Sequence, residues 1–368
     1  MFESLPLKNI TLKNSFIRSA TSERVSSGGY PDIELLGNLY RRLAEGEAGT
    51  ILTGFCFVSP EGQSSPTQNG LHEDGLIPVW QSIIEKSRAQ EFNTKIFAQI
   101  VHGGRQITFP TKLPNLVPSE TSIPVSVNSF RVMNKKDIEG VREAFVRAAE
   151  RAVQAGFDGV QIHCAHGYLL NEFLSPAINK RNDEYGGNTK NRTRLLIEIF
   201  SDIRASYPDI PLAVKINGCD YIKNGLVPEE TSEIISLIKD FSLAFYEVSG
   251  WMWEGDDSKA PSRKKDPKIP AEEGYYQNET LSLQKDHPDE FFALCGGIRS
   301  MNFCRHISKN IQLLSMSRPF ISEPNLVKLF MESKKSRVRC ISCNMCVTRG
   351  PEKGLECIYF NNKRMNSN

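Results

Sequence analysis

Residues 137–165 read DIEGVREAFVRAAERAVQAGFDGVQIHCA, and this stretch decides the fold. Its first part, residues 137–155, carries apolar side chains at spacings of three and four, which is the period of a helix with one buried face. Its second part, residues 159–165, is a short apolar run typical of a strand that is covered on both faces. A helix that leads directly into a buried strand indicates a βα unit of a parallel sheet.

The same alternation of apolar run and helical segment continues along the chain in both directions. Eight apolar runs predict strands, over residues 16–20, 50–59, 95–102, 159–165, 212–218, 245–250, 291–297 and 312–319. Further helices are predicted over residues 193–206, 228–241 and 323–332. Eight consecutive units favour an α/β fold of the (β/α)8 TIM-barrel class, with a doubly wound open sheet as the alternative.

The predicted barrel fills residues 1–335, and residues 336–368 form a short Cys-rich C-terminal extension. Residues 103–136 and 251–277 are longer than ordinary connections between a strand and a helix, and both are rich in Pro, Ser and charged residues. They follow predicted strands at the end of the barrel where active sites lie. We therefore expect them to act as lids over the site.

The composition excludes several classes of protein. The 368 residues include 45 Lys and Arg against 43 Asp and Glu, and 39% are hydrophobic, which is typical of a folded protein with a large core. A net charge of +2 provides no basic field for nucleic acid, and no stretch without charge is long enough to span a bilayer. The first residues lack the features of a secretory signal. We expect a cytoplasmic protein that acts on a small molecule.

A group of three side chains at the end of the fourth predicted strand suits chemistry on a carbonyl compound. His163, His166 and Tyr168 lie within six residues. An imidazole can donate a hydrogen bond to a carbonyl oxygen, and a tyrosine stays protonated at neutral pH and can serve as an acid. A metal site is a weaker alternative because no carboxylate stands at a matching spacing. A purely structural role, with one histidine packed in the barrel and Tyr168 capping the loop, is the other alternative.

The sequence around these residues resembles a known family. Residues 162–187, IHCAHGYLLNEFLSPAINKRNDEYGG, continued by NRTR at 191–194, are similar to the signature of the old yellow enzyme family of flavin-dependent ene-reductases. Matching segments follow in order along the chain: NSFIRSATSE at 14–23, QIVHGGR at 99–105, VKIN at 214–217, GGIR at 296–299 and SRPFI at 317–321. The resemblance covers nearly the whole chain and implies the barrel fold that the apolar runs predict.

This resemblance implies that FMN binds without a covalent bond at the barrel mouth. The positions that match the flavin-binding residues of the family are Ser19, Ala20, Thr21, Gln99, Lys215, Gly296, Gly297, Ser317 and Arg318. Gln99 would contact the pyrimidine edge of the flavin, and Lys215 would lie near N1 and O2, where many members have Arg. Arg318 would be the counter-ion of the phosphate, and Ser317 stands where the family usually has Gly.

The resemblance also implies the roles of the three catalytic candidates. His163 and His166 match the pair that binds the carbonyl oxygen of the substrate, and Tyr168 matches the proton donor. The implied reaction takes a hydride from NAD(P)H through FMN and reduces the C=C bond of an α,β-unsaturated carbonyl compound. Two alternatives remain open: an electron-transferring flavin dehydrogenase coupled to a separate redox partner protein, and a flavin-binding redox sensor with little turnover. A homo-oligomer is equally open.

Four cysteines near the C-terminal end raise the question of a metal. Cys340, Cys343, Cys346 and Cys357 supply four thiolates, which suits a [4Fe–4S] cluster or, as a less favoured choice, a tetrahedral zinc ion. Four reduced cysteines without metal are the remaining alternative. The segment is similar to the cluster-binding part of 2,4-dienoyl-CoA reductase and trimethylamine dehydrogenase, which are longer relatives. The other cysteines are interpreted as small buried apolar residues, namely Cys56, Cys164, Cys219, Cys295 and Cys304.

Overall fold

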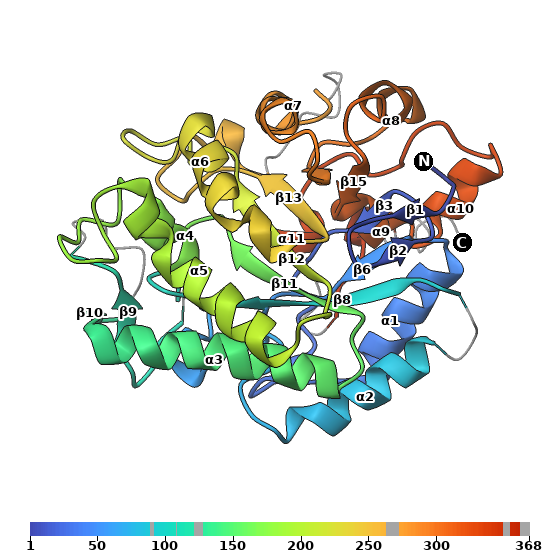
Figure 1. The fold of residues 1–368 in the computed structure, drawn as a ribbon. Coiled ribbons are helices and arrows are strands. Elements are labelled where there is room, and N and C mark those ends of the chain that lie inside the picture. The colour runs from blue at the N-terminus through green and yellow to red at the C-terminus, as the bar shows by residue number, and fades with distance from the viewer. Residues whose placement is uncertain (89–91, 108, 121–127, 263–271, 349–353, 361–368) are drawn as a thin grey trace.

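The computed structural model of the protein describes residues 1–88, 92–107, 109–120, 128–262, 272–348 and 354–360. Its centre is a closed parallel barrel, so the predicted fold class is confirmed (Figure 1). The barrel strands are β3 (Phe16–Arg18), β6 (Thr50–Leu52), β8 (Lys95–Val101), β11 (Gly159–Cys164), β12 (Leu212–Asn217), β13 (Phe245–Ser249), β14 (Phe292–Cys295) and β15 (Leu313–Met316). Closure follows from the pairing of β11 with both β8 and β12, which rules out an open sheet.

Helices cover the outside of the barrel (Figure 1). They are α1 (Ile33–Glu45), α2 (Leu76–Ser87), α3 (Lys135–Gln154), α4 (Leu169–Leu174), α5 (Thr189–Ser206), α6 (Pro228–Ile238), α7 (Gln277–Asp286), α8 (Met301–Ile307), α9 (Arg318–Ser322), α10 (Leu326–Met331) and α11 (Met345–Thr348). Helix α3 corresponds to the predicted helix over residues 137–155. It begins at Asn134, whose side chain accepts from the backbone N–H of Asp137 while the Asp137 carboxylate accepts from that of Asn134. This capping box satisfies two backbone donors and fixes the start of the helix.

The lower part of the barrel interior is an apolar floor. It consists of Ile17, Leu52, Phe97, Ala213, Phe245, Ala293 and Leu313 from the strands, together with Ala244 and with Leu7 and Leu12 beside the N-terminal hairpin of β1 (Leu5–Pro6) and β2 (Thr11–Leu12). All of these residues are buried. The hairpin therefore closes the end of the barrel that lies opposite the C-terminal ends of the strands.

A polar layer lies directly above the apolar floor. Its members are Ser19, Gln99, Gln161, Lys215, Glu247, Cys295 and Ser315, which are all buried and contact one another across the barrel axis. Six of them follow a floor residue by two positions, as expected when alternate side chains of a strand point inward. The floor thus supports a layer of charged and hydrogen-bonding groups beneath the barrel mouth.

Two predicted strands differ from the observed ones. The run over residues 50–59 forms β6 and a separate strand, β7 (Cys56–Phe57), because the chain passes close to Glu23 at Gly54, where a Cβ atom would lie 1.8 Å from the carboxylate. The run over residues 312–319 ends at Met316. Pro319 fits the first turn of α9, so the chain leaves the sheet earlier than its apolar character suggests.

The smaller elements lie in the connections between barrel strands and helices. They are β4 (Ser26–Ser27), β5 (Tyr30–Pro31), β9 (Asn115–Val117), β10 (Phe130–Val132) and the 3-10 turns Pro60–Gly62, Lys239–Phe241 and Asp257–Lys259. Two predicted helices are shorter than expected: the last residues of the run over 228–241 form the second of these turns, and α10 spans only the middle of the run over 323–332.

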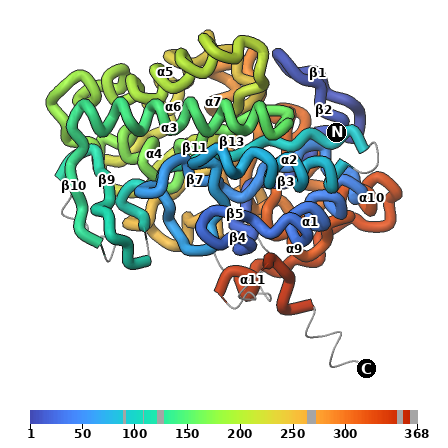
Figure 2. The backbone as a smooth tube through the Cα atoms, turned by 90° about the horizontal axis from the view of Figure 1, so that it is seen from below, coloured from blue at the N-terminus to red at the C-terminus, as the bar shows by residue number. Residues whose placement is uncertain are grey.

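The extension after residue 335 stays in contact with the barrel. The Ser336 carbonyl accepts from the N–H of Met301, at 2.8 Å, and the N–H of Val338 donates to the Arg299 carbonyl, at 2.9 Å. Helix α11 follows, and Figure 2 shows it beside the barrel near α9. Among the described residues, no helix combines the length and the apolar character that crossing a membrane requires.

Candidate active site

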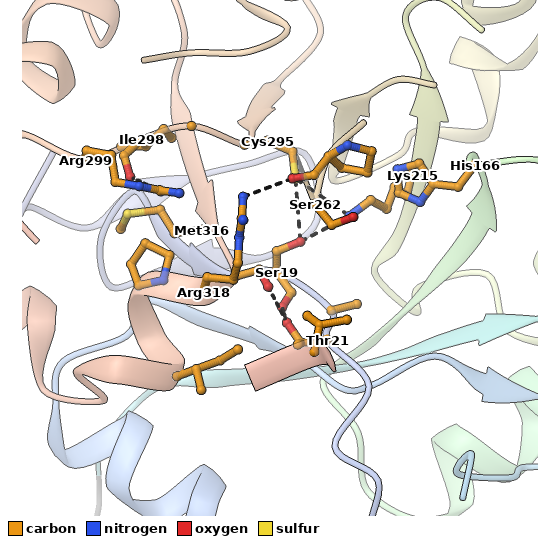
Figure 3. A pocket seen from close by; sticks show the side chains of 18 residues that line it. Ser19, Thr21, His166, Lys215, Ser262, Cys295, Ile298, Arg299, Met316 and Arg318 are labelled. Atoms are coloured by element: carbon orange, nitrogen blue, oxygen red, sulfur yellow. Dashed lines mark hydrogen bonds between the residues drawn. The ribbon is translucent and has the colours of Figure 1, made fainter. Parts of the chain in front are cut away.

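The C-terminal ends of the barrel strands surround a cavity that is open to solvent (Figure 3). It brings together nine of the twelve residues predicted to bind flavin or substrate: Ser19, Ala20, Thr21, His166, Lys215, Gly296, Gly297, Ser317 and Arg318. Gln99 is not among the lining residues. It lies in the polar layer beneath, where its side-chain N–H donates to Gln161 at 2.6 Å. His163 and Tyr168 lie beside His166, as described below.

Positive charge stands on two sides of this cavity. Figure 3 shows Lys215 next to His166 on one side and Arg299 on the other, with Arg318 between them. Arg299 is buried, and its Nε has no hydrogen-bond partner among the described residues. A buried donor without a partner is costly, so this guanidinium favours an anionic ligand.

These residues fit FMN, which joins an apolar ring system to a phosphate. Lys215 would meet the ring end, and Arg299 and Arg318 would meet the phosphate end. Gly296 and Gly297 have φ values of +95° and +77°, and a Cβ on Gly297 would lie 2.5 Å from the Tyr275 ring. Glycine is therefore required here, and it lets the backbone line the cavity.

The two histidines form a compact pair at the end of β11. The ring centroids of His163 and His166 are 5.3 Å apart, and the rings are nearly perpendicular. Nδ1 of His163 accepts from the backbone N–H of Ala165 at 3.2 Å, so its proton resides on Nε2. Burial, followed by His166 and Lys215, holds the pKa of His163 well below its usual range, and burial and Lys215 lower the pKa of His166 to about 3. Both rings are therefore neutral hydrogen-bonding groups at physiological pH.

His166 occupies a strained turn that fixes its direction. Its φ is +61°, a left-handed conformation that is unfavourable for a residue with a side chain, and Gly167 follows at +77°. The turn is held by Asn217, which accepts from the N–H of His166 at 3.1 Å, and by Gln106, which donates to its carbonyl. Nε2 of His166 lies 2.7 Å from the hydroxyl of Ser249. These contacts aim the ring at the cavity.

Tyr168 lies beside the histidine pair at the start of α4. Its ring is 5.0 Å from that of His163 and 5.6 Å from that of Phe55, measured between centroids. Burial raises the pKa of Tyr168 to about 12, although a hydrogen bond with Ser64 opposes the shift. The phenol therefore keeps its proton at neutral pH and can donate it to a bound molecule.

The described parts of the two predicted lids meet at a buried ion pair. Arg105, in the segment 103–136, lies 2.6 Å from the carboxylate of Glu254, in the segment 251–277. The backbone N–H of Arg105 also donates to Glu172 of α4, at 2.8 Å. Burial raises the pKa of Glu172 to about 8, and the Glu254 carboxylate adds to this effect. Residues 108, 121–127 and 263–271 of the two segments lie outside the described residues.

Comparison with known proteins shows to which family the chain belongs. Residues 1–336 match the pattern of the NADH:flavin oxidoreductase / NADH oxidase family. The chain belongs to this family. It is 31% identical over 346 residues to an NADH-dependent flavin oxidoreductase from Aspergillus parasiticus, an alignment that covers 87% of this chain and 76% of the relative.

Solved structures show that this flavin oxidoreductase shares its fold with the old yellow enzymes. An old yellow enzyme homologue from Zymomonas mobilis superimposes with a TM-score of 0.77 at 24% identity, covering 95% of this chain and 98% of the homologue. A 2-naphthoyl-CoA reductase superimposes with a TM-score of 0.83 at 23% identity and covers 94% of this chain. The flavin oxidoreductase spans about half of that reductase, 54% of its length.

Several residues that line the cavity of the flavin oxidoreductase were not predicted from the sequence. The sequence indicates a small buried apolar residue at Cys295, yet this residue lines the cavity and its sulfur is 3.7 Å from Nζ of Lys215. Arg299 belongs to the segment GGIR, which resembles the family, and its positive charge is the feature that could have indicated an anion-binding role. Ser262 and Val347 gave no signal, because their positions depend on the paths of the second lid and of the C-terminal extension.

The four cysteines of the extension line a second, much smaller cavity. Arg318 and Ile321 border both cavities, and Val347, which follows Cys346, borders the larger one. Among the described residues, no three His, Cys, Asp or Glu side chains converge as ligands of a metal ion. The metal site therefore stays a prediction, although the sulfur donors share one cavity.

Proposed function

We propose that this flavin oxidoreductase uses FMN and NAD(P)H to reduce the C=C bond of an α,β-unsaturated carbonyl compound. The observation that carries the proposal is the group of His163, His166 and Tyr168, in which two neutral imidazoles and one protonated phenol adjoin each other and His166 lines the cavity. We place the reaction in the cytoplasm, with a small molecule as substrate. When bound, FMN would carry the hydride from NAD(P)H to the β-carbon of the substrate.

The histidines would polarise the substrate. Nε2 of His163 carries a proton that is available for a carbonyl oxygen, because Nδ1 is occupied by the backbone. A hydrogen bond to that oxygen withdraws electrons from the C=C bond and makes its β-carbon electrophilic. Neutral donors suit this task because they stabilise the developing oxyanion without giving up a proton to it.

Tyr168 would complete the reaction by protonating the α-carbon. Its high pKa keeps the phenol protonated until the carbanion-like α-carbon develops, which is a stronger base. The ring packs against those of His163 and Phe55, and these contacts restrain the position of the hydroxyl. The lining residues would hold FMN with Ser19, Ala20 and Thr21 at the ring, and Gly296, Gly297 and Ser317 at the phosphate.

Steady-state kinetics with NAD(P)H and a simple enone such as cyclohexenone test the proposal. We expect Tyr168→Phe to lower the rate of enone reduction by about 10²-fold or more while the reduction of FMN by NAD(P)H stays within a few-fold of wild type. Tyr185→Phe is the matched control, because Tyr185 also has a pKa raised to about 12 but contacts Glu198. Unchanged enone reduction in a His163→Ala and His166→Ala double variant would refute the assignment.

A second candidate function rests on the shared border of the two cavities. If Cys340, Cys343, Cys346 and Cys357 hold a [4Fe–4S] cluster, Arg318, which borders both cavities, would lie between the cluster and the flavin, and electrons would pass to a separate partner protein. Iron, sulfide and zinc assays on protein purified without oxygen distinguish the metals. About four iron per chain that is lost in Cys343→Ser, but kept in Cys304→Ser, supports the cluster. A metal-free protein contradicts it.

A further inference from the structure

The polar layer beneath the cavity contains a buried ion pair that the proposed mechanism does not use. Nζ of Lys215 lies 3.2 Å from Oε1 of Glu247, and the side chains are 5% and 0% exposed. Lys215 lines the cavity, whereas Glu247 does not. The carboxylate therefore lies in the same polar layer as the cation, but it influences the cavity only through other side chains.

Glu247 is surrounded by donors that keep it ionised. Ser19 and Ser315 donate to its Oε1 at 2.7 and 2.6 Å, and Gln161 donates to its Oε2 at 3.0 Å. Burial alone would raise the pKa of this carboxyl, but Lys215 and the three donors outweigh burial, so the pKa is lowered. Three donors and an adjacent ammonium group together favour the ionised carboxylate at this position.

The same contacts determine how Lys215 is directed. Its ammonium group also donates to the hydroxyl of Ser19 at 3.1 Å and to the sulfur of Cys295 at 3.7 Å. Ser19 therefore accepts from the cation and donates to the anion, and it lines the cavity itself. The positive charge that reaches a ligand in the cavity is the charge of Lys215 reduced by that of Glu247.

We propose that Glu247 is a positioning residue that limits the positive charge Lys215 presents to bound FMN and so keeps the flavin a strong reductant. This inference rests on the proposed use of FMN. Reduction adds negative charge to the flavin ring, so a nearby cation favours the reduced form and a nearby anion disfavours it. With Lys215 and Glu247 both present, the reduction potential of the flavin should lie between the value expected with the cation alone and the value expected with the anion alone.

The reduction potential of FMN bound to the full-length protein tests this inference independently of turnover. We expect Glu247→Gln to shift the equilibrium toward reduced FMN by about tenfold or more, which is about +30 mV for a two-electron couple. Glu247→Asp keeps the negative charge, but the shorter side chain holds it farther from Lys215. The reduction potential should therefore also rise, by less than in Glu247→Gln. Glu290→Gln is the matched control, because Glu290 pairs with Lys8 outside the polar layer, and it should leave the potential unchanged.

The outcomes are distinct from those of the enone assay. An unchanged or lowered potential in Glu247→Gln would overturn the inference, as would a folded Gln variant that no longer binds FMN, since Glu247 would then only build the cavity. If the Gln variant does not fold, the Asp variant decides, and a potential at or below that of wild type overturns the inference. Loss of enone reduction in Tyr168→Phe has no bearing on these potentials, so the two proposals can fail separately.

Discussion

Replacing Glu172 by Gln should change how stability depends on pH. The carboxyl is fully buried in α4, and its pKa rises from 4.5 to about 8 because of burial. The folded protein therefore holds a proton on Glu172 up to about pH 8, whereas the unfolded chain releases it near pH 4.5. Wild type consequently loses about 1.4 kcal/mol of unfolding free energy per pH unit across this interval, roughly 5 kcal/mol in total. A glutamine at this position carries no proton to lose.

Thermal unfolding of wild type and Glu172→Gln between pH 5 and pH 9 measures the effect. A chain of this length changes its melting temperature by roughly 1.3 °C per kcal/mol. The two proteins should melt together near pH 5, and the variant should melt about 6 °C higher by pH 8 to 9. Asp202→Asn, at an exposed site on α5, controls for the removal of a carboxylate. If the melting temperatures of wild type and Glu172→Gln changed in parallel between pH 5 and pH 9, the reasoning would be refuted.

Three further changes have defined outcomes. Asn134→Ala removes the capping box of α3 and should cost about 1 kcal/mol of unfolding free energy in urea titrations, whereas no change would mean that packing alone fixes the helix start. Gly167→Ala places a Cβ 2.2 Å from the Gln106 amide at a φ of +77°, so it should lower enone reduction at least about tenfold in the kinetic assay. Asn344→Ala removes the side-chain oxygen that accepts from Arg318 at 2.5 Å and should weaken FMN binding several-fold in a fluorescence titration; unchanged affinity would mean that this contact does not position Arg318 for the phosphate.

The barrel was predictable because each of its strands is buried on both faces. Interior packing and the outer helices both demand apolar residues, so the eight runs stand out in the sequence. The positions of His163, His166 and Tyr168 followed from the rule that chemistry lies where parallel strands end. The break between β6 and β7 was hidden, because it depends on the approach of Glu23 to Gly54, which comes from a distant part of the chain.

The residues of the polar layer are visible in the sequence, but the sequence does not show that they lie at one level of the barrel. Gln161, Lys215 and Glu247 each interrupt an apolar run, and a single run does not reveal which of its faces points to the axis. Only closure of the barrel brings these residues to one level and pairs Lys215 with Glu247. The contribution of Val347 depends on the fold of the extension against the barrel, which no local pattern specifies.

The apolar floor has a consequence for the order in which the protein folds during synthesis. It joins Leu7 and Leu12, which precede the first barrel strand, with Leu313 of the last barrel strand. The N-terminal hairpin has no complete surface to cover until about 300 further residues have been made, and contacts so distant in the chain form slowly. Leu7 and Leu12 can therefore reach their buried positions only after the last barrel strand has been made and has closed the barrel.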